Sequence, residues 1–195
     1  DNTIVIYTSD NGMNLGHHGI WGKGNGTFPM NMFDTSVKVP TIMKVPGVNN
    51  VVSDDLLSHY DIMPTLLDYL DIDLPEKEIM PGKSCAELLK GNKLKEDHNV
   101  VIYDEYGPVR MIRSKEWKYV HRYPEGPHEL FDMVNDPYEV RNLINDPIQV
   151  DRIKELRNGL QEWFEKHIKP GQDGSVLPVT GEGQFDLTEK GDNAF

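Results

Sequence analysis

The sequence has very little cysteine and no long hydrophobic run. Its 195 residues include one cysteine, which excludes an internal disulfide bond and says little about the cellular compartment. No segment approaches the roughly 18 consecutive apolar residues of a membrane-spanning helix, so we expect no membrane span. Localisation stays open between a secreted, a periplasmic and a cytoplasmic protein.

Basic residues are scarce as well. The chain carries 20 lysine and arginine residues against 32 aspartate and glutamate residues, which gives a net charge of −12 at pH 7. An acidic surface repels polyanions, so we do not expect nucleic acid as a partner. A sulfated or phosphorylated ligand would need a local positive site that overcomes this field.

Polar residues follow the first predicted strand. Residues 3–7, Thr-Ile-Val-Ile-Tyr, form the short β-branched and aromatic run that is typical of a buried parallel strand. Asp10 and Asn11 follow the strand, and Gly12 is expected to let the chain turn sharply away. Taken alone, these three residues more often form a simple turn. In open α/β sheets, however, ligands bind at the carboxyl ends of the strands, so this position is a candidate site.

A glycine-rich segment comes next. Glycines at 16, 19, 22, 24 and 26 disfavour a regular helix and indicate a loop that folds back over the strand end. Lys23 of this loop could then reach Asp10 and Asn11. Hard oxygen ligands beside a lysine are suited to holding a cation and polarising a sulfate or phosphate group.

The motifs of residues 9–40 resemble the second half of the sulfatase family, within the alkaline-phosphatase-like superfamily. They read Ser-Asp-Asn-Gly, then Leu-Gly-His-His-Gly-x-Trp-Gly-Lys, then Phe-Asp-Thr-Ser-Val-Lys-Val-Pro. The resemblance implies that Asp10 and Asn11 ligate Ca²⁺, with Mg²⁺ as an alternative, and that Lys23 binds the substrate sulfate. It also suggests His18 as a pocket residue, although a histidine that packs the loop or is exposed is an equally good interpretation.

Further motifs follow in the family's order. Residues 58–67 resemble its Asp-x-x-Pro-Thr-Leu-Leu helix, residues 82–89 its Gly-x-Ser-x-x-x-Leu-Leu segment, and residues 129–143 its closing Glu-Leu-Tyr-Asp signature. Together these motifs cover most of residues 1–165. The resemblance is specific because several separate motifs keep their order.

The nucleophile motif of the family is absent. Sulfatases of this type use a formylglycine made from the Cys or Ser of Cys/Ser-x-Pro-x-Arg, and Cys85 is followed by Ala-Glu-Leu instead. The resemblance therefore implies the C-terminal portion of a sulfatase. An N-terminal half of the same sulfatase would supply the formylglycine and the remaining metal ligands. The expected substrate is a sulfated small molecule or carbohydrate, and we expect the chain alone to be inactive.

Two other functions stay open. The parent could be a phosphodiesterase or a phosphonate monoester hydrolase of the same superfamily, since a metal pair and a lysine serve phosphoryl transfer equally well. The chain could also be a non-catalytic remnant that kept the fold. The upstream sequence would separate these hypotheses, whereas substrate identity, exo or endo action and oligomeric state stay undetermined.

The predicted fold class is α/β with two units. Residues 1–95 are expected to form the C-terminal part of an alkaline-phosphatase-like α/β sandwich. A second strand is predicted at 39–45, a helix capped by Asp61 with Pro64 in its first turn, and a short helix at 84–90. Leu66, Leu67 and Leu70 are expected to form the apolar face of the first helix.

Residues 96–195 are predicted to form a small α+β subdomain with a wrapping tail. Four short runs, at 100–103, 109–113, 117–121 and 129–131, indicate an antiparallel sheet. A helix that begins at Asp146-Pro147 keeps apolar residues at helical spacing, and these should pack on the sheet.

Several polar residues near the predicted unit boundary have two interpretations. Tyr103, Glu105, Tyr106 and Arg110 could shape a substrate subsite, and a polar sheet face is the more common alternative. His59 precedes a capped helix, which favours a structural role.

Overall fold

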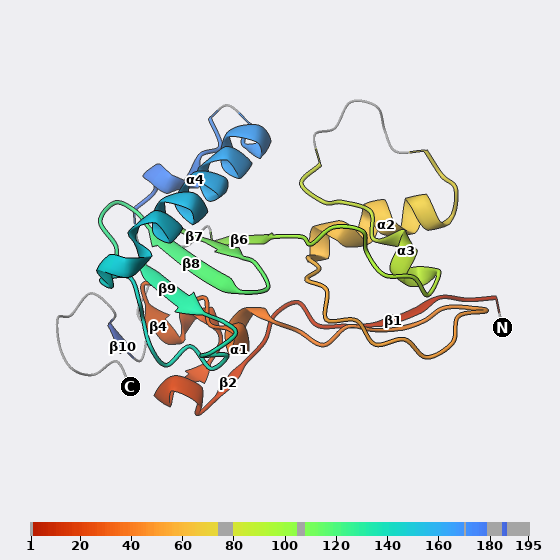
Figure 1. Cartoon of the computed structure of the whole chain (residues 1–195), viewed down its shortest axis with the longest axis horizontal. Helices are drawn as coiled ribbons and strands as arrows, with labels where there is room; N and C mark the ends of the chain where they lie inside the picture. The colour runs from red at the N-terminus through yellow and green to blue at the C-terminus, as the bar shows by residue number, and fades with distance from the viewer. Residues whose placement is uncertain (1, 74–79, 105–107, 170, 179–184, 187–195) are drawn as a thin grey trace.

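The structure is a computed structural model that describes residues 2–73, 80–104, 108–169, 171–178 and 185–186. Glu105, Tyr106 and most of the predicted tail lie outside these residues. Figure 1 shows that the elements gather in two groups, one around a four-stranded sheet and one around a two-stranded ribbon.

The strands are β1 (Val5–Tyr7), β2 (Asn14–Leu15), β3 (Trp21–Gly22), β4 (Thr27–Phe28), β5 (Ile42–Lys44), β6 (Val100–Asp104), β7 (Val109–Arg113), β8 (Trp117–Arg122), β9 (Glu129–Asp132) and β10 (Phe185–Asp186). The helices are α1 (Asp34–Val37), α2 (Ile62–Tyr69), α3 (Ala86–Leu89) and α4 (Val150–His167), with short 3-10 helices at His17–Gly19, Gly24–Gly26, His59–Asp61, Pro147–Gln149 and Gly174–Val176.

The four predicted runs form one antiparallel sheet in the order β6-β7-β8-β9. Each strand pairs with the next along the chain, as in Met111 opposite Val120 and Val120 opposite Glu129. The predicted fold class is therefore confirmed for this part of the chain. The turn residues between the runs were a sufficient signal because every connection is local.

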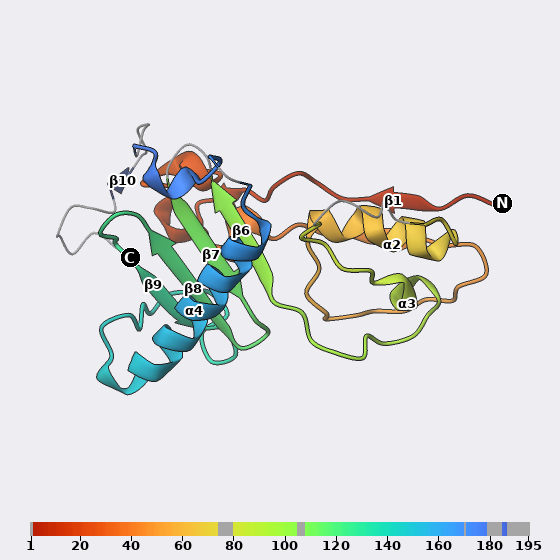
Figure 2. The same ribbon diagram turned by 90° about the horizontal axis from the view of Figure 1, so that it is seen from above.

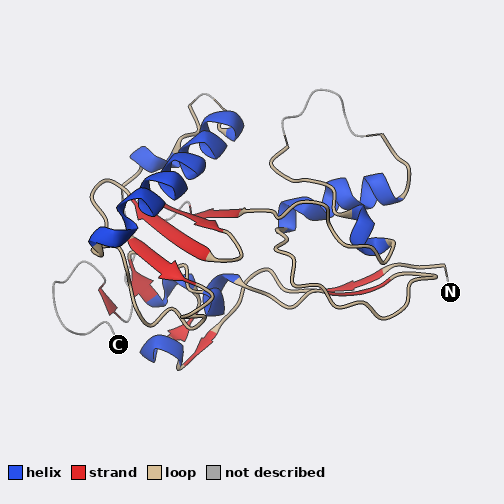
Figure 3. Ribbon diagram, viewed as in Figure 1, coloured by secondary structure: helices blue, strands red, loops and turns tan. Residues whose placement is uncertain are grey.

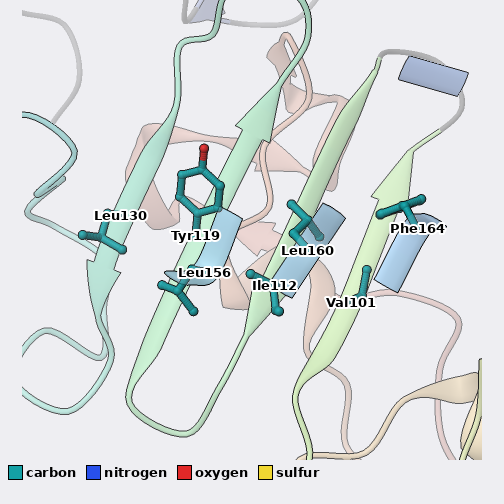
Figure 4. Close-up of a cluster of buried hydrophobic side chains, with 7 residues drawn as sticks. All are labelled: Val101, Ile112, Tyr119, Leu130, Leu156, Leu160 and Phe164. Carbon is teal, nitrogen blue, oxygen red and sulfur yellow. The ribbon is translucent and has the colours of Figure 1, made fainter. Parts of the chain in front are cut away.

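Helix α4 covers one face of this sheet (Figure 2). It begins after a 3-10 turn capped by Asp146, whose side chain accepts the Ile148 backbone N–H at 3.0 Å, with Pro147 in the first turn. The apolar stripe of α4 then packs on alternate residues of the strands, as predicted. The buried cluster consists of Val101, Ile112, Tyr119, Leu130, Leu156, Leu160 and Phe164 (Figure 4).

The opposite face of the sheet carries buried cations. Because side chains alternate along a strand, Lys118 and Arg122 point away from α4 while Tyr119 points toward it. The segment from β2 to α1 packs on this cationic face (Figure 1). Apolar contacts accompany the cations, with Met32 against Val109, Met111 and Val120. The segment belongs to the first predicted unit by sequence and contacts the sheet of the second.

Lys118 forms the central polar contact of this interface. Its ammonium is fully buried and donates to the Met32 carbonyl at 2.9 Å, to the Glu139 carboxylate at 2.6 Å and to the Asp34 carboxylate. Glu139 also accepts the Asp34 backbone N–H at 2.6 Å. Three separate parts of the chain therefore meet at one charge.

The two carboxylates of this cluster titrate differently. Burial alone would raise the pKa of Asp34, but Lys118 and Arg113 outweigh it and lower this pKa. Burial is the main cause that raises the pKa of Glu139; the Asp34 charge raises it further, and Lys118 only partly offsets the two. The second cation, Arg113, lies 3.6 Å from Asp34 and explains the difference.

A two-stranded ribbon of β1 and β5 forms the other group, next to α2 and α3 (Figure 3). The predicted buried parallel strand is wrong in two respects. Strand β1 pairs antiparallel with β5, and its Val5 and Tyr7 side chains are 54% and 65% exposed. A run of β-branched residues predicts extended backbone but carries no information on strand direction. In the described residues, no second layer covers Val5 and Tyr7.

Helix α2 begins where predicted, with Pro64 as its third residue. The Asp61 side chain differs from the prediction because it does not cap α2. It accepts the Ser58 N–H at 2.7 Å and the Lys83 N–H at 2.9 Å, which ties the segment before α3 to α2. The predicted apolar face is partly wrong, since Leu70 is exposed while Pro64 and Thr65 are the buried residues.

A short strand near the end of the described residues lies beside the glycine-rich loop. Strand β10 pairs in parallel with β4 of that loop. Within the described residues, no helix combines the length and apolar character that crossing a bilayer requires.

Replacing Leu160 tests the packing of α4 on the sheet. Leu160 is 2% exposed within the main cluster, so Leu160→Ala should lower the free energy of unfolding by about 2–5 kcal/mol. The neighbouring Gln161 is exposed, so Gln161→Ala should change it by less than about 0.5 kcal/mol. Urea unfolding of both variants measures the difference, and equal small effects would show that α4 does not pack as described.

Candidate active site

Asp10 and Asn11 follow β1 as predicted. The Asp10 carboxylate is exposed and accepts the Asn11 backbone N–H at 2.9 Å and the Ser9 hydroxyl at 3.2 Å. These bonds, first that of Asn11, lower the pKa of Asp10, and the Lys23 charge acts in the same direction. The carboxylate is therefore ionised at neutral pH and accessible to a cation.

Lys23 reaches this pair. Its ammonium donates to the Asn11 side-chain oxygen at 3.1 Å, although twelve residues separate the two. The loop thus folds back over the end of β1, as the glycine pattern predicts. Three of the four predicted site residues, Asp10, Asn11 and Lys23, consequently lie together.

The role of Gly12 differs from the prediction of a sharp turn. Its φ is not positive; instead its backbone lies directly against α1. A β-carbon at this position would lie 2.3 Å from the Thr35 carbonyl oxygen and 2.9 Å from that of Lys38. The Gly12 N–H donates to the Ser36 carbonyl at 2.8 Å. A side chain is excluded here by close backbone approach.

A buried chain of amides and hydroxyls fixes the loop, and the sequence interpretation missed it. Asn14 donates to the Ser36 hydroxyl at 2.6 Å, and Ser36 donates to the Asn31 side-chain oxygen at 2.6 Å. Asn31 in turn donates to the Gly24 carbonyl at 3.0 Å and lies 3.4 Å from the Lys23 carbonyl. Asn14 and Asn31 are almost completely buried, and these bonds satisfy their side chains.

His18 packs within the loop. Its ring stacks on Phe33 with centroids 3.8 Å apart and planes 9° from parallel. Burial is the main cause that lowers its pKa, so the ring is neutral at pH 7. The neighbouring His17 is exposed and its Nδ1 accepts the Leu15 N–H at 3.2 Å. The stacking on Phe33 explains the position of His18. Its role as a pocket residue stays a prediction.

Of the residues predicted to shape a substrate subsite, Tyr103 and Arg110 are described and lie on the α4 face. Tyr103 packs edge-on against Phe164 with centroids 5.5 Å apart, and Arg110 lies over the same ring. Residues 30–34, which adjoin the Lys23 loop, contact the opposite face. The structure therefore does not bring Tyr103 and Arg110 to Lys23.

Cys85 lies away from the Lys23 loop, next to α2. Its backbone N–H donates to the Thr65 hydroxyl at 2.9 Å, and burial raises the pKa of its thiol to about 11. A thiol with this pKa is almost entirely protonated at pH 7 and a poor nucleophile.

The donor set suits a hard divalent cation but is incomplete. Asp10 and Asn11 offer a carboxylate and an amide oxygen, the ligands that Ca²⁺ and Mg²⁺ prefer. In the described part of the chain, no group of three or more His, Cys, Asp or Glu residues could hold a metal ion. These two residues would fit only as part of a larger set of metal ligands.

Comparison with known proteins identifies the family. Residues 16–166 match the family described as N-sulphoglucosamine sulphohydrolase, C-terminal. The chain belongs to this family. It is a C-terminal region of sulfatases in the alkaline-phosphatase-like superfamily, which confirms the resemblance found in the motifs.

Individual sulfatases and solved structures are similar to most of the chain. The choline-sulfatase of Rhizobium meliloti (strain 1021) is 34% identical over 141 residues, 70% of this chain and 26% of that protein. A solved 2-O GAG sulfatase is similar with a TM-score of 0.74 and 30% identity over 92% of this chain and 39% of that one. The phosphonate monoester hydrolase of Agrobacterium radiobacter has a TM-score of 0.64 at 24% identity, covers 85% of this chain and 35% of that one, and shows the shared fold alone.

The chain spans only part of these proteins, about a quarter of the length of the choline-sulfatase. The residues that match the family model, 16–166, contain Lys23 and the four-stranded sheet.

Calcium binding tests the incomplete donor set. With two protein oxygen ligands against the roughly 6–8 that Ca²⁺ takes, the chain should bind Ca²⁺ with an affinity weaker than about 10⁻⁴ M. Asp10→Asn should weaken binding further, whereas Asp54→Asn, at an exposed carboxylate distant in sequence, should not. Isothermal calorimetry with sub-micromolar affinity would mean that other carboxylates of this chain complete the site.

Proposed function

We propose that this chain forms the C-terminal part of a sulfatase that hydrolyses sulfate esters. In this proposal Asp10 and Asn11 hold a divalent metal, and Lys23 binds the sulfate group. The observation that carries it is the 3.1 Å contact between the Lys23 ammonium and the Asn11 side-chain oxygen, which brings the lysine next to the two proposed metal ligands. Family membership supports sulfate ester hydrolysis in general.

The proposed substrate is a sulfated sugar. The support comes from a similar structure whose name describes a 2-O GAG sulfatase. The nucleophile, a formylglycine, would lie in an N-terminal half of the same protein, because the sequence has no Cys/Ser-x-Pro-x-Arg motif. That half would also supply the remaining metal ligands.

Each residue has a defined task in this scheme. A bound Ca²⁺ or Mg²⁺ would supply Lewis-acid polarisation of a sulfate oxygen. Lys23 offsets the negative charge on the sulfate oxygens, which is greatest when the bond to the leaving group breaks. The buried chain through Asn31 holds the Lys23 backbone, so the ammonium is positioned before the substrate arrives.

A phosphonate monoester hydrolase is the second candidate. A metal with a lysine serves phosphoryl and sulfuryl groups equally well, and one such hydrolase shares the fold. Relatives with more than 30% identity are described as sulfatases, which favours sulfate esters. Comparing kcat/KM for an aryl sulfate and an aryl phosphonate separates the two candidates.

Replacing Lys23 tests the assignment in the full-length enzyme. Lys23→Ala should lower kcat/KM by roughly 10²-fold or more, because one electrostatic contact to the transition state is lost. Lys23→Arg should recover little of the lost kcat/KM, since the planar guanidinium is larger than an ammonium and would place its charge differently. Lys38→Ala removes an exposed lysine from the same segment and should leave kcat/KM unchanged.

Steady-state kinetics with a thermal melt of each variant decides the question. An unchanged kcat/KM in a folded Lys23→Ala enzyme would remove Lys23 from the site. The 195-residue chain alone should show no turnover, because the nucleophile is missing from it. Turnover by the chain that persists in its Lys23→Ala variant would overturn this division of roles.

A further inference from the structure

A pocket lies on the α4 face of the sheet. It has a volume of about 490 Å³ and lies between α4, the beginning of β7, the end of β8 and residues 173–175 after α4. This volume falls in the range of small-molecule sites, about 300–1,000 Å³. Residues 30–34, next to the Lys23 loop, pack on the other face, so the pocket is separate from the candidate active site.

Arg110 forms the buried wall of this pocket. The residue is only 8% exposed, and its guanidinium lies 3.7 Å from the Phe164 ring centroid and 5.1 Å from that of Tyr123. Two aromatic contacts fix the plane of the guanidinium. The charge is therefore held in place before any ligand binds.

A carboxylate of the chain itself occupies this arginine. Asp173 accepts a hydrogen bond from the Arg110 Nη2 at 2.5 Å. Its side chain is about half exposed and belongs to the short segment after α4. The same oxygen accepts the Ser175 backbone N–H at 2.9 Å. The contact with Asp173 shows that the Arg110 guanidinium can bind a carboxylate.

A second cation faces the pocket. Arg157 of α4 lines it, is exposed and has no ion pair within the described part of the chain. The lining also holds Glu165, so the two arginines face two carboxylates of the chain, and displacement of Asp173 from Arg110 leaves the arginines in excess. Burial is the main cause that lowers the pKa of His121 to about 4, and His128, Arg157 and Arg110 lower it further.

We propose that this pocket binds the carboxylate of an acidic sugar. The ligand carboxylate takes the place of Asp173 at Arg110, and Arg157 supplies the second positive charge. The remaining lining includes Tyr123, Gln161 and Ser175, whose hydroxyl and amide groups can bond sugar hydroxyls. The argument is independent of the proposed sulfatase reaction.

Asp173→Asn gives the sharpest test. The asparagine oxygen still accepts the Ser175 N–H and keeps the turn, while the competing charge at Arg110 is removed. Glucuronate titrated into the chain and followed by NMR should bind the variant about tenfold more tightly than the original chain. Glucose, which lacks the carboxylate, should bind neither.

Matched substitutions on α4 test the second cation. In the Asp173→Asn background, Arg157→Gln should weaken glucuronate binding about tenfold. Lys166→Gln removes an exposed charge nine residues along the same helix, on its other side, and should have no effect. Both positions are exposed, so folding is preserved.

Four results would overturn the proposal. Asp173→Asn could fail to tighten binding, Lys166→Gln could weaken it as much as Arg157→Gln, or glucose could bind as well as glucuronate. Equal affinity for inorganic sulfate and glucuronate would overturn the assignment to an acidic sugar.

Discussion

The fold depends on one buried ammonium. Lys118 has no exposed surface and contacts Asp34, Glu139 and the Met32 carbonyl. Removing a charge from water costs several kcal/mol, and only a complete set of partners compensates for it. Lys118 lies on β8, and its partners come from residues 32–34 before the sheet and from the segment after β9. Correct assembly of all three is therefore required before the ammonium can be buried.

The two faces of the four-stranded sheet differ in character. The face toward α4 is mainly apolar and is stabilised by the removal of its side chains from water. The other face combines apolar contacts with Lys118 and Arg122, which bind the loop of residues 30–34. Directional hydrogen bonds fix the position of that loop more strictly than apolar contacts do. The loop in turn holds Asn31, and Asn31 contacts the backbone at Lys23.

Local features could be predicted from the sequence. The four strands, the cap at Asp146 and the contact of Lys23 with Asn11 depend on neighbouring turns, caps and glycines. The direction and exposure of β1 depend on partners distant in the chain, and its prediction was wrong. The close contact of Gly12 with the Thr35 carbonyl could not be predicted, because it joins residues that approach each other only in the folded chain.

The buried polar residues were missed for a related reason. Asn14, Asn31 and Ser36 are ordinary loop residues by sequence, and nothing in their spacing indicates a buried chain of hydrogen bonds. Lys118 lies in a run that was correctly predicted as a strand. Its burial follows from the alternation of that strand and from the two carboxylates that face it, one of them 84 residues away.

Hydrogen exchange at one amide tests most directly whether Lys118 positions the site loop. The Asn31 backbone N–H donates to the Gly24 carbonyl at 3.0 Å and reports on the loop that carries Lys23. Lys118→Met should lower its opening free energy by about 3 kcal/mol, because Glu139 and Asp34 lose their cation. Adding Glu139→Gln should restore part of this loss by removing one uncompensated charge. Unchanged Asn31 protection in a folded Lys118→Met chain would show that the loop is held without Lys118 and would contradict the account.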